Sequence, residues 1–189
     1  MKPNETLLDL LLETQVLDRV PRSGYFLRGV PEPESVAEHS WHVAFLVWLL
    51  GSREPDLDLG RALQLALLHD LAEARIGDLP QTVARYFSEG AKMEAERAAI
   101  AEMLAPLPQA SRDLYDEYTA RSTKEARFVK VCDKLQLMIK VLAYQRWGAG
   151  GLDEFWHNPA NFVESEFESA NRLTRELRER YEGWRRGAG

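Results

Sequence analysis

The stretch that decides the fold is Ala66-Leu67-Leu68-His69-Asp70-Leu71-Ala72-Glu73, an apolar run interrupted by an imidazole beside a carboxylate. Helical periodicity predicts that this stretch is part of an amphipathic helix. A histidine and an aspartate on a hydrophobic helix are costly to bury unless they are paired or bound to a metal. Suitable partners occur elsewhere, in His39 upstream and Asp133 downstream. The doublet therefore indicates a helical core with a polar centre.

Helical periodicity continues through most of the chain, and no stretch has the alternation typical of a strand. Ser35, followed by Glu38 three residues later, has the form of a capping box, and Asp58 is expected to cap the next helix. We expect a loop from Tyr25 to Glu34 and a break at Gly77 and Pro80. The prediction is an all-α bundle of about six to eight helices, including residues 5–20, 35–50, 59–74, 91–105, 109–120, 124–147 and 159–184.

The length of 189 residues suits one domain, expected to span 1–189 with a core at about 7–145 and a C-terminal helix at about 159–184. The formal net charge of −6, without a dense Lys/Arg segment before the last few residues, argues against nucleic acid as a partner. The longest apolar segment, Val43 to Leu50, is too short to cross a membrane. One cysteine, Cys132, and the lack of a signal peptide predict a cytoplasmic location.

Four side chains of ligand type come from three of the predicted helices: His39, His69, Asp70 and Asp133. Side chains that meet in a helical core commonly build metal sites. Two imidazoles and two carboxylates suit a divalent ion such as Mn, Fe, Co, Ni or Zn, and the absence of a thiolate excludes a structural cysteine-type zinc site. Each residue alone also has a structural interpretation; Asp133, for example, can pair with Lys130 or Lys134.

Two acids follow the doublet closely. Glu73 lies four residues after His69, a spacing that places both on one helix face, and Asp78 follows the break at Gly77. Two acids beside a metal-bound water are what a hydrolase requires, one to transfer a proton and one to orient. The structural alternatives are a salt bridge from Glu73 to Arg75 or Arg61 and a capping role for Asp78.

The set His39, His69-Asp70 and Asp133 resembles the H…HD…D signature of the HD-domain metal-dependent phosphohydrolases. Longer segments resemble the 5′-deoxynucleotidase branch of that family, and the similarity covers roughly residues 7–144. These segments are Arg19-Val20-Pro21-Arg22-Ser23-Gly24-Tyr25, Pro33-Glu34-Ser35-Val36-Ala37-Glu38-His39-Ser40, His69-Asp70-Leu71-Ala72-Glu73 and Gly77-Asp78-Leu79-Pro80.

The resemblance implies an HD-domain helical bundle, a homodimer, and release of phosphate from 2′-deoxyribonucleoside 5′-monophosphates. It implies support by a divalent ion such as Co, Mn or another transition metal, with Mg as an alternative. The implied metal ligands are His39, His69, Asp70 and Asp133. Glu73 matches the catalytic acid and Asp78 its companion, although these two acids can instead hold a second ion.

The substrate is expected to meet the loop before residue 35. Arg22 and Arg28 can neutralise phosphate charge, because the planar guanidinium pairs with two oxygens, although each can equally be a solvated surface charge. Tyr25 stands where a relative carries tryptophan, in the segment expected to meet the nucleotide. His42, three residues after His39, has no counterpart in the signature and is interpreted as a packing residue or as one that contacts a metal ligand without binding the ion.

Two other functions remain open from the sequence. One is an HD phosphohydrolase that acts on a cyclic nucleotide or a triphosphate, and the other is a non-catalytic nucleotide sensor that keeps the metal ligands. The presence of both Glu73 and Asp78 argues against the sensor. A set of aromatic residues can either form a dimer interface or cap the core: Trp147, Phe155, Trp156 and Trp184.

Overall fold

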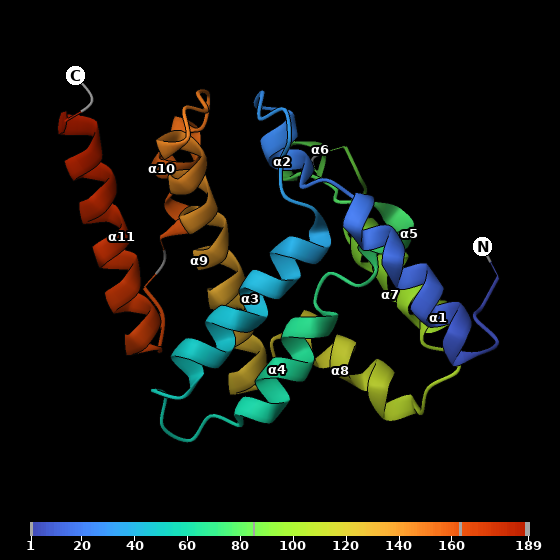
Figure 1. Ribbon diagram of the computed structural model, residues 1–189. Helices are drawn as coiled ribbons and strands as arrows, with labels where there is room; N and C mark the ends of the chain where they lie inside the picture. Colours follow the sequence, from blue (N-terminus) through green and yellow to red (C-terminus); the bar gives the residue numbers. More distant parts are fainter. Residues whose placement is uncertain (1, 85, 163, 188–189) are drawn as a thin grey trace.

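The computed structural model describes residues 2–84, 86–162 and 164–187, and these residues form helices without a strand (Figure 1). An isolated antiparallel bridge joins Pro21 to Ser35. The all-α class predicted from the sequence is confirmed. The α-helices are α1 (Leu7–Thr14), α2 (Ser23–Phe26), α3 (Val36–Gly51), α4 (Leu59–Leu68), α5 (Glu73–Ile76), α6 (Gln81–Ala84), α7 (Ala91–Met103), α8 (Gln109–Ala120), α9 (Lys124–Arg146), α10 (Asp153–His157) and α11 (Glu168–Gly187).

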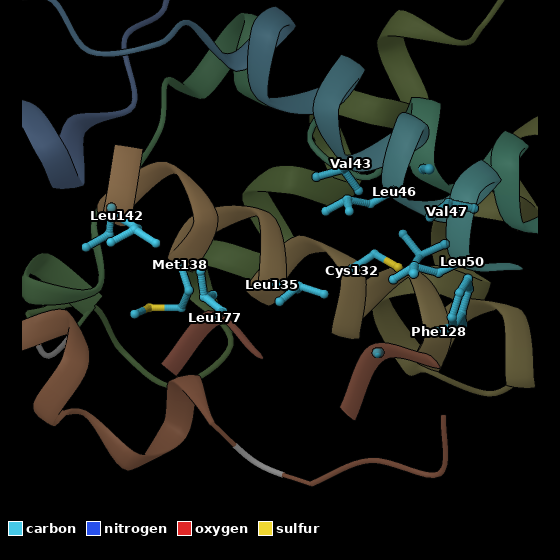
Figure 2. Close-up of a cluster of buried hydrophobic side chains, with 14 of the residues drawn as sticks. Val43, Leu46, Val47, Leu50, Phe128, Cys132, Leu135, Met138, Leu142 and Leu177 are labelled. Atoms are coloured by element: carbon cyan, nitrogen blue, oxygen red, sulfur yellow. The ribbon is translucent and has the colours of Figure 1, made fainter. Parts of the chain in front are cut away.

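Helix α9 is the centre of the fold and packs against α3, α4, α8 and α11. Figure 1 shows α11 beside α9 at one edge of the molecule, with α1, α5 and α7 at the opposite edge. The main core lies along α9, where Phe128, Cys132 and Met138 are almost fully buried with Val43 and Val47 of α3 (Figure 2). None of the helices in the described ranges is both long and apolar enough to cross a membrane.

Helix α3 begins as its sequence predicts. The Ser35 hydroxyl accepts a hydrogen bond from the Glu38 backbone N–H, and the Glu38 carboxylate accepts one from the Ser35 N–H, which completes the capping box. The bridge to Pro21 is reinforced by a bond from the Arg22 N–H to the Glu34 carbonyl oxygen. These contacts fix the segment that carries Arg22 against the start of α3, close to His39.

The predicted helix over 59–74 is interrupted at residues 69–72. Helix α4 ends at Leu68, a turn segment over 69–72 follows, and the short helix α5 begins at Glu73. The imidazole of His69 takes part in this break, because its Nδ1 lies 2.7 Å from the carbonyl oxygen of Ala66, in the last turn of α4. Gly77 then ends α5 with φ of 75°, in the left-handed region that glycine reaches without strain.

Three other expected boundaries also differ. The helix expected over 5–20 is α-helical to Thr14 and continues as a 3₁₀ helix, Gln15–Arg19, a tightening that is common at helix ends. The loop expected from Tyr25 begins inside α2. The helix expected over 159–184 is a 3₁₀ turn, Pro159–Asn161, followed by α11.

Candidate metal centre

The structure brings the four predicted ligands together from three parts of the chain. The Nε2 of His39 lies 3.3 Å from the Nε2 of His69 and 3.2 Å from an Asp133 oxygen. One Asp70 oxygen lies 3.2 Å from the His69 Nε2 and 3.4 Å from the His39 Nε2. His39 comes from α3, Asp133 from α9, and the doublet from the turn after α4. The ligand atoms of His39, His69 and Asp70 thus surround one point, and Asp133 approaches them through its contact with His39.

Both carboxylates in this cluster are held in the charged form. Burial opposes ionisation of Asp70, but His69, Arg22 and His39 outweigh it and hold the pKa of its carboxyl well below the usual value. The same balance lowers the pKa of Asp133, where the main opposing charge is Lys130, with its Nζ 2.7 Å from the second carboxylate oxygen. Charged carboxylates are the form that binds a cation.

Glu73 lies beside the cluster with its side chain almost fully buried. Burial, together with the nearby negative charges of Asp70 and Asp78, raises the pKa of Glu73 to about 10. Its Oε2 is buried without a hydrogen-bond partner and lies 3.8 Å from the Arg22 guanidinium. The expected approach of Glu73 to the doublet is therefore present, although it is produced by the turn after α4 and not by one continuous helix.

Arg22 connects the acids around the centre. Its Nη1 lies 3.3 Å from an Asp70 oxygen and 3.2 Å from an Asp78 oxygen. The other Asp78 oxygen accepts a hydrogen bond of 2.6 Å from the Ser23 N–H. Both oxygens of Asp78 are thus engaged, so Asp78 holds Arg22 in place and orients it toward the cluster.

The donor set fits a divalent ion. Two imidazole Nε2 atoms lie 3.3 Å apart beside two charged carboxylates, and their lone pairs and negative charges repel one another unless a cation lies between them. The buried Glu73 Oε2, which has no hydrogen-bond partner, is a further polar atom at this place. Mixed nitrogen and oxygen ligands suit a borderline divalent metal. Within the described residues, His39, His69 and Asp70 are the side chains whose ligand atoms cluster within 4.8 Å of one another.

A cleft of about 670 Å³ opens onto the centre, and Asp70, Glu73 and Asp133 form part of its wall. Tyr25 and Arg28, which the sequence analysis expects to meet the substrate, also line this cleft. The Tyr25 hydroxyl donates to the Leu137 carbonyl oxygen at 3.1 Å, and the residue is almost fully buried. The Arg28 guanidinium binds Glu154 and the Gly24 carbonyl oxygen and lies over the Phe155 ring.

Two residues of this region were not assigned a role from the sequence, Gln136 and Glu34, which are buried behind His39. The pairing of Asp133 with Lys130, one of the alternatives considered from the sequence, is present. The position of Gln136 three residues after Asp133 places both on one face of a helix, and this spacing is the sequence signal for a residue close to the centre. Glu34 lies in a Pro-rich loop without a periodic pattern, so the sequence offers no such signal for it. His42 stays outside the cluster, as predicted: it is half-exposed, and its Nδ1 lies 2.8 Å from the Glu38 carbonyl oxygen.

The four aromatic residues considered for either an interface or the core lie in three different surroundings: the core, the cleft and the surface. Trp156 is buried and stacks on Tyr181 at 3.8 Å, so it caps the core, and Phe155 lines the cleft. Trp184 packs partly against the same core, while Trp147 is 73% exposed.

Residues 15–172 match the model of the HD domain, and the chain belongs to the HD domain family. The chain is 33% identical over 162 residues to the 5′-deoxynucleotidase HDDC2 of Xenopus laevis, covering 82% of this chain and 79% of that protein. A conserved hypothetical protein from Pyrococcus furiosus has a similar structure, with a TM-score of 0.77 and 36% identity over 91% of this chain and 99% of its own. A predicted metal-dependent phosphohydrolase from Magnetospirillum magnetotacticum also has a similar structure, with a TM-score of 0.69 and 28% identity. The match covers 95% of this chain and 92% of that one.

Proposed function

We propose that the protein is a metal-dependent 5′-deoxynucleotidase that hydrolyses 2′-deoxyribonucleoside 5′-monophosphates to deoxynucleoside and phosphate. The observation that carries the proposal is the buried acid Glu73 beside the His-Asp cluster, at the end of an open cleft. The similarity to a 5′-deoxynucleotidase over most of the chain supports it.

The residues that would hold the ion are His39, His69, Asp70 and Asp133. A second ion at Glu73 and Asp78, the alternative that the sequence leaves open, would have to displace Arg22 from Asp78. A bound divalent cation supplies charge for a phosphate oxygen and lowers the pKa of a bound water. We take the ion from the class Co, Mn or another transition metal, with Mg as an alternative.

Glu73 is the group that moves a proton. Because its pKa is raised, the Glu73 carboxyl carries a proton at neutral pH when no cation is bound. Its buried Oε2 makes no hydrogen bond to another protein group, so a proton on this oxygen is not engaged elsewhere. It can therefore give a proton to the leaving 5′ oxygen or pass one from the attacking water. Asp78 has both oxygens engaged by Arg22 and Ser23, and its role is to orient.

Charge neutralisation and substrate orientation fall to the residues along the cleft. Arg22 faces the acids at the bottom of the cleft, and Arg28 lies farther along it over Phe155. A phosphate at the cluster would place the nucleoside along the wall formed by the rings of Tyr25 and Phe155. Positioning and charge neutralisation are the main sources of catalysis in phosphoryl transfer, so this arrangement suits the reaction.

The test is a phosphate-release screen of the purified protein with Mn, Co and Mg. Deoxynucleoside 5′-monophosphates should release phosphate faster than the matching ribonucleotides, and cyclic nucleotides and triphosphates should be poor substrates. Release only from cyclic nucleotides or triphosphates would support the alternative phosphohydrolase, and no release with any metal would support a sensor. The variant Glu73→Ala should retain metal and lose most turnover; a near-normal kcat would contradict the role of Glu73.

The homodimer and the cytoplasmic location expected from the sequence belong to the same proposal. A stripe on α3 supports an interface: Trp41, Phe45 and Trp48 are 61%, 45% and 54% exposed, and the rings of Trp41 and Phe45 stack at 5.4 Å. Exposed aromatic patches commonly mark contact surfaces. Light scattering should give the mass of a dimer for the natural chain and a smaller mass for Phe45→Glu, and cell fractionation tests the location.

A further inference from the structure

Glu34 is a buried carboxylate that the mechanism above does not use. Its side chain is 2% exposed and lies behind His39, away from the cleft. A buried carboxylate is costly unless its oxygens are bonded. Here the Lys140 ammonium lies 2.9 Å from one oxygen, and the Gln136 amide nitrogen donates to both oxygens at 3.0 and 3.1 Å. The Glu34 N–H also donates to the Tyr144 hydroxyl at 2.6 Å, so the backbone is fixed as well.

The contact with Glu34 determines which way the Gln136 amide faces. An amide has a donating NH₂ side and an accepting carbonyl side, whereas an ionised carboxylate only accepts. The NH₂ group must therefore face Glu34, and the Oε1 faces the His39 ring, where it lies 2.6 Å from Nδ1. The opposite orientation would place two acceptors against each other in a buried site.

The orientation of Gln136 in turn determines the tautomer of His39. Because the Gln136 Oε1 can only accept, the His39 Nδ1 carries the hydrogen and donates it. The Nε2 is then left with a lone pair, and this atom faces Asp133 at 3.2 Å and His69 at 3.3 Å. A neutral imidazole with a free Nε2 lone pair is the form that binds a metal.

His69 reaches the same state by another means. Its Nδ1 lies 2.7 Å from the Ala66 carbonyl oxygen, a backbone acceptor that no side-chain substitution removes. His39 instead depends on two side chains, one from the loop before α3 and one from α9. The tautomer of His39 is therefore the part of the centre that a substitution outside the ligand set can disturb.

We propose that Glu34, acting through Gln136, is a positioning residue that selects the Nδ1–H tautomer of His39 and thereby sets the metal affinity of the centre. The inference rests on the metal centre of the proposed function and not on the identity of the substrate. Replacing Glu34 by glutamine gives two facing amides. Lys140 holds the oxygen of the new amide, whose NH₂ group can then face Gln136, so the Gln136 amide is no longer forced to present its oxygen to His39.

The experiment measures Mn²⁺ affinity by titration calorimetry and the His39 tautomer by ¹⁵N chemical shifts of the imidazole ring, both on the full chain. Glu34→Gln should weaken Mn²⁺ binding by about tenfold to a hundredfold and give a mixed tautomer. Gln136→Leu, which removes the acceptor, should weaken binding to a similar degree. At saturating metal, kcat of Glu34→Gln should return to within about threefold of the natural value, because the defect lies in affinity.

A swapped double variant, Glu34→Gln with Gln136→Glu, separates positioning from packing. It puts a carboxylate beside His39 and an amide behind it, so a single acceptor again faces Nδ1, and Mn²⁺ affinity should recover to within about threefold. Glu117→Gln is the matched control, since Glu117 is a shielded carboxylate paired with Arg61 but unconnected to His39; it should lose stability and keep its affinity.

The proposal would be overturned if Glu34→Gln and Gln136→Leu both folded, bound Mn²⁺ within about twofold of the natural chain and kept the Nδ1–H tautomer. Failure of the swapped variant to recover affinity, with its fold intact by circular dichroism, would overturn it as well. If the natural chain releases no phosphate from any nucleotide, the proposed function fails, while the affinity and tautomer measurements still decide the role of Glu34.

Discussion

Replacing Glu73 by glutamine should stabilise the protein when no metal is present, even though Glu73 lies at the centre of the proposed site. The carboxyl titrates near its usual value of 4.5 in the unfolded chain and at about 10 in the fold. Between these values the folded state holds one more proton than the unfolded state, so stability falls as pH rises, by about 1.4 kcal/mol for each pH unit.

The size of the effect follows from that slope. Between pH 4.5 and pH 7 the buried carboxyl lowers the free energy of unfolding of the natural chain by about 3 kcal/mol. Glutamine stays neutral, so the variant does not lose this stability. The side chain is almost fully buried, so little of this is lost to solvent screening. Glu73→Gln should therefore match the natural chain near pH 4.5 and exceed it by a growing margin up to pH 8.

The assay is urea denaturation followed by circular dichroism, in chelator, at half-unit steps from pH 4.5 to 8. Glu117→Gln is the control: despite some burial, hydrogen bonds from Arg61 and Thr123 lower the pKa of Glu117. That carboxyl stabilises the fold above its unfolded pKa and loses this effect only at lower pH, so the difference between Glu117→Gln and the natural chain should be nearly constant across the range assayed. A pH-independent difference between Glu73→Gln and the natural chain would refute the reasoning.

Four further outcomes are expected. Asp70→Ala and Asp133→Ala should each lose bound metal, measured by elemental analysis, together with phosphate release; retention of both would remove the residue from the ligand set. Arg22→Gln should raise the KM for a deoxynucleoside monophosphate by tenfold or more, of order 1.4 kcal/mol, since a cation among the acids of the cleft is lost; an unchanged KM would place substrate phosphate elsewhere. Mn²⁺ at a hundred times its Kd should stabilise the natural chain by about 2.7 kcal/mol in urea denaturation, and an unchanged midpoint would show that no ion binds the folded state. Phe128→Ala, at a fully buried position, should cost about 3–5 kcal/mol with metal content unchanged, and a cost below 1 kcal/mol would contradict its place in the core.

The long helices could be predicted closely because helical periodicity extends over their whole length. The helix expected over 109–120 is α8, and the one expected over 124–147 is α9, which ends at Arg146. The short helices α2, α6 and α10 were not found. Helices of four or five residues are too short to show a period and depend on tertiary contacts for their stability.

The ligand-type residues could be found because their chemistry conflicts with their apolar surroundings, a conflict that is visible in the sequence. Residues behind them could not be found in this way. Gln136 is uncharged and occupies a position on α9 where a polar side chain is unremarkable, and Glu34 has its partners about a hundred residues away. Their role exists only once α9 packs against α3.

The end of α4 at Leu68 and the buried position of Gln136 serve the same purpose, because each supplies a hydrogen-bond acceptor to a histidine. A histidine that binds metal through Nε2 needs an acceptor for its Nδ1–H. The last carbonyl groups of a helix lack partners within the helix, so His69, directly after α4, can use the Ala66 carbonyl oxygen of its own chain segment. His39 lies near the start of α3, and its Nδ1 faces an acceptor from another element, the Gln136 Oε1 of α9. The ring orientation of His69 is thus determined by its own chain segment, whereas that of His39 depends on the packing of α3 against α9. Mutations along the interface between α3 and α9 should therefore change metal affinity through His39 before they affect His69.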